Sequence, residues 1–276
     1  MDLAAEIERN VRAALAEDLG SGDLTAPLIP SAKRARATVL CRQKAVLCGQ
    51  PWFEACIRQL DPSATVSWAM REGADIPSGA RVCSVEGEAR ALLAAERVAL
   101  NFLQTLSGVA TAARRYVEAV AGTQARIVDT RKTLPGLRLA QKYAVRTGGG
   151  SNHRIGLYDA MLIKENHIAA AGGIRKAIQQ AQKLERGGDW IQVEVESLDQ
   201  LREALAAGAT MILLDNMSVE QMREAVKVAA GRAELEASGG ITLENARAIA
   251  ETGVNRMSVG SLTKDLKAAD FSMRFE

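Results

Sequence analysis

A cluster of cations and glycines near the middle of the chain could bind a compact polyanion. Arg131 and Lys132 are neighbours, and residues 148–154 read Gly-Gly-Gly-Ser-Asn-His-Arg. An arginine can hold a carboxylate through two parallel hydrogen bonds, and a lysine adds a compact positive charge. No Lys-Ser or Lys-Thr pair follows the glycines, so this is not the phosphate-binding loop of nucleoside triphosphatases. The cluster predicts a carboxylate or phosphate site. The alternative is a salt-bridged surface loop, and Arg138 and Lys142 could simply face solvent.

Six short apolar runs end in residues that are charged or can bind phosphate. The runs cover residues 126–129, 160–164, 190–195, 210–215, 233–238 and 256–260. They alternate with segments of helical periodicity, a pattern typical of β/α units around a parallel sheet. The residues at their ends are Asp129, Lys164, Glu194, Asp215, Ser238 and the pair Gly260-Ser261. Because β/α barrels carry their active sites at the carboxyl ends of the strands, these residues are expected to meet in one cavity.

One of these runs has a polar face. Along Ile-Gln-Val-Glu-Val-Glu at 191–196, alternation puts Gln192, Glu194 and Glu196 on the same side of the strand. The neighbouring runs are nearly all apolar, which favours a polar cavity on that side over a solvated edge strand. Asp215 has a plainer alternative role, as an acid at the N-terminus of a helix.

Glycine turns follow the last two runs, at Ser238-Gly239-Gly240 and at Gly260-Ser261. Glycine lets a ligand approach backbone N–H groups, and barrels often bind phosphate after their last strands. Either turn alone could be ordinary turn chemistry. Their pairing predicts a phosphate-bearing substrate.

Composition excludes several kinds of partner. With 35 Lys and Arg against 33 Asp and Glu, the net charge is only +2, so no global basic field favours nucleic acid or membrane. No apolar run reaches the roughly 20 residues of a membrane span, and residues 1–19 do not resemble a signal peptide, so a cytoplasmic protein is expected. The four cysteines lack zinc or redox spacing and are interpreted as reduced structural thiols. With only two histidines, an imidazole metal cluster is not expected.

Two domains are expected. Residues 1–110 combine an amphipathic helix with runs of β-forming residues, typical of a small N-terminal α+β domain. A proline-free stretch from residue 90 to about 120 predicts one long helix or two abutting ones. Residues 111–276 carry six predicted strands, fewer than the eight of a closed barrel, so the α/β fold predicted there is an incomplete, open β/α barrel. The C-terminal tail could pack back on the first domain.

Several segments together resemble the quinolinate phosphoribosyltransferase family (nicotinate-nucleotide pyrophosphorylase, carboxylating), in order across nearly the whole chain. They are Glu-Arg-Val-Ala-Leu-Asn-Phe-Leu-Gln at 96–104, Asp-Thr-Arg-Lys-Thr at 129–133, the glycine-rich run at 148–154, Lys-Glu-Asn-His at 164–167, Glu-Val-Glu at 194–196, Leu-Asp-Asn at 214–216 and Ser-Gly-Gly-Ile at 238–241. Thr147 departs from the pattern, since many relatives have cysteine there. The resemblance implies a two-domain subunit with an open barrel, working as a homodimer with shared active sites that could assemble further.

The resemblance also implies an activity and a set of site residues. The family transfers the phosphoribosyl group of phosphoribosyl pyrophosphate to quinolinate with decarboxylation. The products are nicotinate mononucleotide, pyrophosphate and carbon dioxide, in de novo NAD biosynthesis. The implied quinolinate residues are Arg131, His153, Arg154, Lys164 and, from the partner subunit, Arg97. The implied phosphoribosyl pyrophosphate residues are Lys132, Glu194, Asp215, Ser238, Gly239, Gly240, Gly260 and Ser261. The implied catalytic residues are Lys132, Lys164, Glu194 and Asp215, with Glu194 and Asp215 binding Mg2+ directly or through water.

Two other functions are alternatives for this sequence. A related phosphoribosyltransferase of molybdenum-transport gene clusters shares the Asp-Thr-Arg-Lys-Thr motif, but residues 151–154 and the Leu137-Arg138 continuation fit the quinolinate branch better. A non-catalytic sensor of a phosphorylated ligand is the other rival. Glu194 and Asp215 argue against it, because a binder of anions gains nothing from two acids in a cationic pocket.

Overall fold

The computed structural model describes residues 2–31, 33–184 and 190–276, and it divides into two compact units. The first unit holds residues up to 114 together with 133–149 and 263–276, and the second holds 115–132 and 150–262. The expected boundary at residue 110 falls inside the 31-residue helix α3 (Ala89–Ala119). No helix in the described residues is long and apolar enough to cross a membrane.

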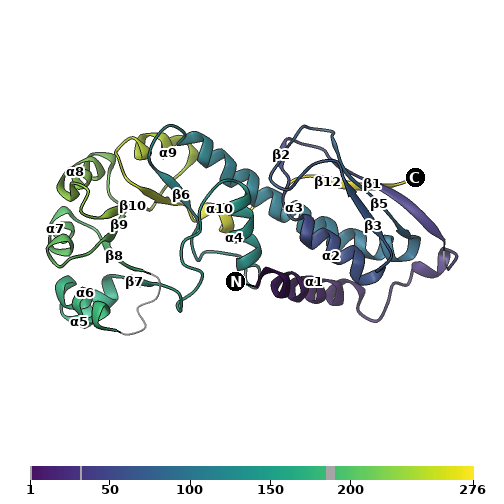
Figure 1. Ribbon diagram of the computed structural model, residues 1–276, viewed down its shortest axis with the longest axis horizontal. Helices are drawn as coiled ribbons and strands as arrows, with labels where there is room; N and C mark the ends of the chain where they lie inside the picture. The colour runs from purple at the N-terminus through teal and green to yellow at the C-terminus, as the bar shows by residue number, and fades with distance from the viewer. Residues whose placement is uncertain (1, 32, 185–189) are drawn as a thin grey trace. The chain divides into compact units, whose positions relative to one another are not determined.

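An antiparallel sheet in the order β12-β1-β5-β3 forms the centre of the first unit (Figure 1). Its strands are β1 (Arg34–Cys41), β3 (Thr65–Trp68), β5 (Arg81–Glu88) and β12 (Phe271–Phe275), and β2 (Ala45–Val46) pairs separately with β4 (Asp75–Ile76). Its helices are α1 (Leu3–Leu19), the 3-10 helix η1 (Ala26–Leu28), α2 (Gln50–Leu60), most of α3, and α4 (Arg138–Thr147). The predicted α+β character is confirmed. The four cysteines are free and buried, and burial raises the pKa of Cys56 to about 12, so they pack as apolar core residues.

The stretch from residue 90 forms one uninterrupted helix rather than two. Gly108 lies in its middle, where glycine costs roughly 0.5–1 kcal/mol relative to alanine. A Cβ at position 108 would lie 2.4 Å from the carbonyl oxygen of Lys267, so the glycine lets the C-terminal segment pass close to α3. That segment continues into β12, where Phe271 pairs with Cys41 of β1. Phe271, Met273 and Phe275 alternate with polar residues along this five-residue strand, a period-two pattern that indicates a strand but was not among the predicted ones.

Six parallel strands in the order β6-β11-β10-β9-β8-β7 form the sheet of the second unit. They are β6 (Arg126–Val128), β7 (Met161–Ile163), β8 (Ile191–Val195), β9 (Met211–Asp215), β10 (Glu234–Ser238) and β11 (Arg256–Ser258). All six predicted strands are confirmed. No pairing joins β6 to β7 within the described part of the chain, so the barrel is open, as predicted.

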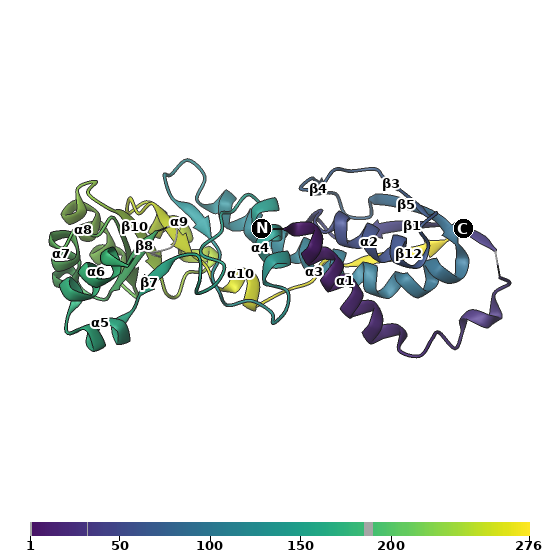
Figure 2. The same ribbon diagram turned by 60° about the horizontal axis from the view of Figure 1, so that its bottom comes forward.

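Helices cover the outer face of this curved sheet, as α6, α7 and α8 show in Figures 1 and 2. The helices of the unit are α5 (Glu165–Ala171), α6 (Ile174–Lys183), α7 (Leu198–Ala206), α8 (Val219–Ala229), α9 (Leu243–Ala250) and α10 (Ser261–Lys264). In α6, buried Ile174, Ala177, Ile178 and Ala181 recur at the three- and four-residue spacing that puts them on one helix face. Ser197 and Ser218 cap α7 and α8, which fixes where each helix begins after its strand.

Candidate active site

The carboxyl ends of the six strands bring the predicted residues of the second unit together. Ser238 pairs with Asp215 across β10 and β9, and Ile163 pairs with Val193 across β7 and β8. The second pairing puts Lys164 beside Glu194, and their charged groups approach to 3.1 Å. Because the Lys164 side chain is 49% exposed, its charge stays accessible to a ligand.

The polar face of β8 runs from the interior of the sheet out to this edge. Gln192 is only 1% exposed, Glu194 is partly buried, and Glu196 is exposed. The polar side of the strand therefore carries the buried Gln192 at its base and the partly buried Glu194 near the strand end. Asp215 is not the cap of the next helix, since the Ser218 side chain accepts the hydrogen bond from the Gln221 N–H.

Asn216 holds the Asp215 carboxylate in place. Its side-chain amide donates to Asp215 Oδ2 at 2.9 Å, and its backbone N–H donates to the Ser238 carbonyl at 3.0 Å. Asn216 adopts a left-handed backbone with φ of 52°. Gly239 leaves the room for it, because a Cβ on Gly239 would lie 2.0 Å from Asn216 Oδ1. The glycine of this turn is thus needed for packing at the strand end.

We expect Gly239→Ala to destabilise the protein more than Gly240→Ala. Both residues have positive φ, at +94° and +58°, but only the new methyl group at 239 would collide with a neighbour. The collision turns Asn216 away from Asp215, which adds roughly 1.5–3 kcal/mol to a backbone strain of about 1–2 kcal/mol. Denaturant unfolding measures both variants. In an Asn216→Gly background the difference should shrink, and an equal cost for both alanines in the original chain would contradict this packing.

Lys132 lies at the other glycine turn. A Cβ on Gly260 would lie 3.2 Å from Lys132 Cδ and 4.0 Å from its Nζ. Ser261 follows at the start of α10, with its hydroxyl 3.4 Å from that of Tyr116. The structure therefore brings a lysine, a glycine turn and a hydroxyl to one place, a combination that suits a phosphate group.

Buried Asp129 organises the cationic side. Its carboxylate accepts hydrogen bonds from the backbone N–H of His153 at 2.9 Å and from the Asn152 side chain at 2.5 Å. Ser151 forms an isolated parallel bridge to Val128 of β6. Residues 151–154 therefore run alongside β6, the edge strand of the sheet.

Arg154 ends this segment, and the charge of Arg131 acts on its guanidinium. Burial first, and the positive charge of Arg131 second, lower the pKa of the Arg154 guanidinium, which stays cationic at neutral pH. One of its amino groups donates to the Ala160 carbonyl at 3.1 Å. Asp159 closes the intervening turn by accepting from the N–H groups of Ile155 and Gly156. Two neighbouring cations in a partly buried place favour the binding of an anion.

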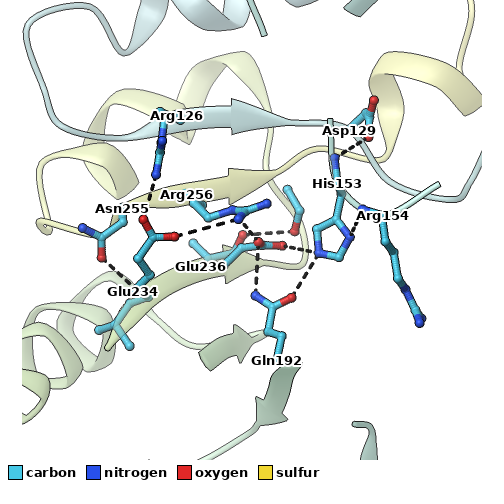
Figure 3. A network of polar contacts seen from close by, with 12 residues as sticks. Arg126, Asp129, His153, Arg154, Gln192, Glu234, Glu236, Asn255 and Arg256 are labelled. Carbon is cyan, nitrogen blue, oxygen red and sulfur yellow. Dashed lines mark hydrogen bonds and ion pairs between the residues drawn. The ribbon is translucent and has the colours of Figure 1, made fainter. Parts of the chain in front are cut away.

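His153 reaches the same region but its ring points into the sheet interior (Figure 3). Its Nε2 lies 3.0 Å from Gln192 Oε1 and 3.5 Å from Glu236 Oε1. The sequence patterns had not singled out Glu236. The sequence does contain a pattern that points to Glu236. Glu234, Glu236 and Ser238 alternate with apolar residues along their strand, as the polar residues of β8 do, so they share one face of the sheet.

Arg97 differs from the other predicted site residues in lying in the first unit, exposed on α3. No ion pair joins it to any residue in the described part of the chain. Its predicted role in a partner subunit's site stays a prediction.

The sequence matches two family descriptions. Residues 23–107 match the quinolinate phosphoribosyl transferase N-terminal domain, and residues 109–274 match the C-terminal domain. The chain belongs to the quinolinate phosphoribosyl transferase family. The probable nicotinate-nucleotide pyrophosphorylase [carboxylating] of Bacillus subtilis is 42% identical over 93% of this chain and 89% of that protein. Quinolinate phosphoribosyltransferase [decarboxylating] 1b of Nicotiana tabacum is 38% identical over 96% of this chain and 81% of that protein.

Solved structures of the quinolinate phosphoribosyl transferase family agree with the fold. The nicotinate-nucleotide pyrophosphorylase of Francisella tularensis superposes with a TM-score of 0.95 at 46% identity, covering 99% of this chain and 96% of that one. The Ehrlichia chaffeensis enzyme gives 0.91 at 37% identity, covering 96% and 97%. The open barrel and the antiparallel N-terminal domain are thus features that this chain shares with its relatives.

Proposed function

We propose that this chain is a quinolinate phosphoribosyltransferase that transfers the phosphoribosyl group of phosphoribosyl pyrophosphate to quinolinate with decarboxylation, in de novo NAD biosynthesis. Relatives that carry this name match nearly the whole chain. The observation that carries the proposal is the strand edge where Lys164 pairs with Glu194 and Asp215 lies on the next strand, together with Arg154, whose pKa burial and the charge of Arg131 lower. Two adjacent carboxylates of a pyridine ring would suit the two guanidinium groups of Arg131 and Arg154.

The chain's residues supply position and charge. Quinolinate lies at Arg131, Arg154 and Lys164, while the phosphates of the second substrate lie at Lys132 and the two glycine turns. The pyridine nitrogen displaces pyrophosphate at the anomeric carbon of ribose, and the carboxylates of Glu194 and Asp215 stabilise the cationic character of the sugar. The ring nitrogen then carries a positive charge. Loss of the 2-carboxylate as carbon dioxide leaves an electron pair at C2 that this charge stabilises until a proton is taken up. No covalent nucleophile is needed.

Magnesium fits this site through few protein ligands. In the described residues no three His, Cys, Asp or Glu side chains gather as a metal site. Magnesium usually takes one or two protein carboxylates together with substrate phosphates, which suits Glu194 and Asp215 on neighbouring strands. When bound with phosphoribosyl pyrophosphate, the ion would neutralise charge on the leaving pyrophosphate.

The direct test is to give the purified protein quinolinate, phosphoribosyl pyrophosphate and magnesium and to look for nicotinate mononucleotide. Formation of this product supports the proposal. A protein that binds the phosphorylated ligand without product would be a sensor, which would refute it. We also propose that the working unit is a homodimer in the cytoplasm. A monomer at catalytic concentrations would contradict that part.

The two halves of the site should respond separately to substitution. Arg154→Ala should weaken quinolinate binding by roughly 1.5–3 kcal/mol, the range for one charge-assisted contact, and should spare phosphoribosyl pyrophosphate. Asp215→Asn should do the reverse by weakening the magnesium complex of phosphoribosyl pyrophosphate. Titration calorimetry of each variant with each substrate measures this. Unchanged quinolinate binding to Arg154→Ala would show that the carboxylates bind elsewhere.

A further inference from the structure

We infer that Glu236, acting through Gln192 and through its own approach to the ring at 3.5 Å, is a positioning residue that holds the His153 ring neutral and fixed, and thereby fixes the backbone that presents Arg154 to quinolinate. The quinolinate part rests on the proposed function. None of these groups in the sheet interior needs to touch substrate. The assignment gives His153 an orienting role in place of a direct contact through its ring nitrogens.

The hydrogen bonds determine which nitrogen of His153 carries the proton. The backbone N–H of Arg154 points at His153 Nδ1 at 2.9 Å, so Nδ1 must accept and cannot carry a hydrogen. The proton therefore lies on Nε2, which donates to Gln192 Oε1 at 3.0 Å. A doubly protonated ring would set two N–H groups against each other at Nδ1. The ring is thus neutral, and both of its nitrogens are engaged within the protein.

Gln192 is oriented in turn by a buried carboxylate. Its amide nitrogen donates to Glu236 Oε2 at 3.2 Å, which leaves its oxygen toward His153 (Figure 3). Glu236 is fully buried, and its charge is balanced by Arg256, whose Nε lies 3.1 Å from the same oxygen. The chain of contacts thus runs from the Arg154 N–H through His153 and Gln192 to Glu236.

The aromatic ring of Trp190 restricts the histidine from another side. The His153 ring meets it edge-on, at 4.9 Å between centroids and 88° between planes. The Arg256 guanidinium lies 5.8 Å from the centroid of the same indole. Rotation of His153 would break its contact with Gln192 and remove the acceptor of the buried Arg154 N–H. A fixed ring therefore means a fixed Arg154 backbone, and this links the interior network to the anion site.

Glu236→Gln tests the inference with almost no change of volume. The new amide group would face the Nε2–H of His153 and disfavour the observed proton position. The KM for quinolinate should rise about tenfold, near the lower end of the effect of removing a partner that orients a histidine in metal sites. The KM for phosphoribosyl pyrophosphate should change little. Glu234→Gln is the matched control, since this carboxylate on the same strand pairs with Arg126 and, at 3.8 Å, with Arg256, but contacts neither His153 nor Gln192 in the described residues.

An exchange of the two side chains tests the mechanism of positioning. In the double variant Gln192→Glu, Glu236→Gln, a carboxylate accepts from His153 and an amide donates to that carboxylate. The KM for quinolinate should return most of the way to its value in the unaltered protein. The single variant Gln192→Glu, by contrast, places two buried carboxylates next to each other. Two results would overturn the inference: Glu234→Gln lowers the affinity for quinolinate as much as Glu236→Gln does, or the exchange fails to restore that affinity. Either result would show that the network contributes only to the general stability of the core.

Nitrogen NMR of the unaltered protein gives a readout that does not depend on turnover. The chain has only two histidines, His153 and His167, so the variant His167→Gln assigns the signals of labelled histidine. At pH 7 His153 should show a protonated Nε2 and an unprotonated Nδ1. A cationic ring or the opposite tautomer would overturn the inference even if the enzyme is active. A locked neutral ring in a protein without activity would refute the proposed function alone.

Discussion

Nicotinate should be turned over far less efficiently than quinolinate, with kcat/KM lower on the order of a hundred- to a thousand-fold. Nicotinate lacks the 2-carboxylate, so it cannot pair with both Arg131 and Arg154, two cations of the proposed quinolinate site. Leaving one buried cation without its ligand partner costs on the order of 2–5 kcal/mol. The measurement is a comparison of kcat/KM for the two acids at saturating phosphoribosyl pyrophosphate.

The Arg154→Ala variant provides the control for this specificity. If Arg154 holds one carboxylate, its removal should harm quinolinate more than nicotinate, and the ratio between them should narrow. Comparable kcat/KM values for both acids in the unaltered enzyme would show that the two cations do not bind the two adjacent carboxylates of quinolinate. A ratio unchanged by Arg154→Ala would assign the discrimination to other residues.

Mixing two inactive variants should restore about a quarter of the original activity. Arg97→Ala and Lys164→Ala should each be nearly inactive, because each removes a cation of the proposed quinolinate site from both copies. If Arg97 acts in the partner's site, one site of a mixed dimer keeps Lys164 of its own chain and Arg97 of the other. Random exchange makes half of the dimers mixed, each with one good site of two, so roughly a quarter of the activity follows from two-fold symmetry.

The matched control for this complementation pairs Lys164→Ala with Glu194→Ala. These two residues form an ion pair within one chain, so every site of a mixed dimer carries one defect and no activity should return. Differently tagged subunits report how many mixed dimers form. Mixed dimers of Arg97→Ala and Lys164→Ala without recovery would place Arg97 in its own subunit's site or in a structural role.

The sequence predicted the parts of this site that depend on strand ends. Each of the six strands is a short apolar run between helical segments, and parallel strands gather their carboxyl ends at one edge. That is why Lys164 and Glu194 could be expected in the same cavity, although their 3.1 Å contact could not be predicted. The open barrel followed from the same count of strands.

Long-range packing could not be predicted in the same way. The side-chain alternation of β8 indicated a polar cavity, but not that Gln192 would be enclosed between His153 and Glu236. Those partners come from a loop and from β10, and no local pattern specifies which polar side chains meet. Lys142 illustrates the same limit, since it could have faced solvent but is 1% exposed. For the C-terminal tail, packing against the first domain was an expectation, but its pairing as β12 with a strand more than 200 residues earlier was not.

In the proposed reaction, phosphoribosyl transfer is coupled to loss of the 2-carboxylate, and labelled quinolinate tests this coupling most directly. One sample carries labelled carbon in the 2-carboxylate and another in the 3-carboxylate, and each is incubated with the enzyme, phosphoribosyl pyrophosphate and magnesium. We predict one labelled carbon dioxide for each pyrophosphate and each nicotinate mononucleotide from the first sample, and none from the second. Release of pyrophosphate without labelled carbon dioxide from the first sample would contradict the account.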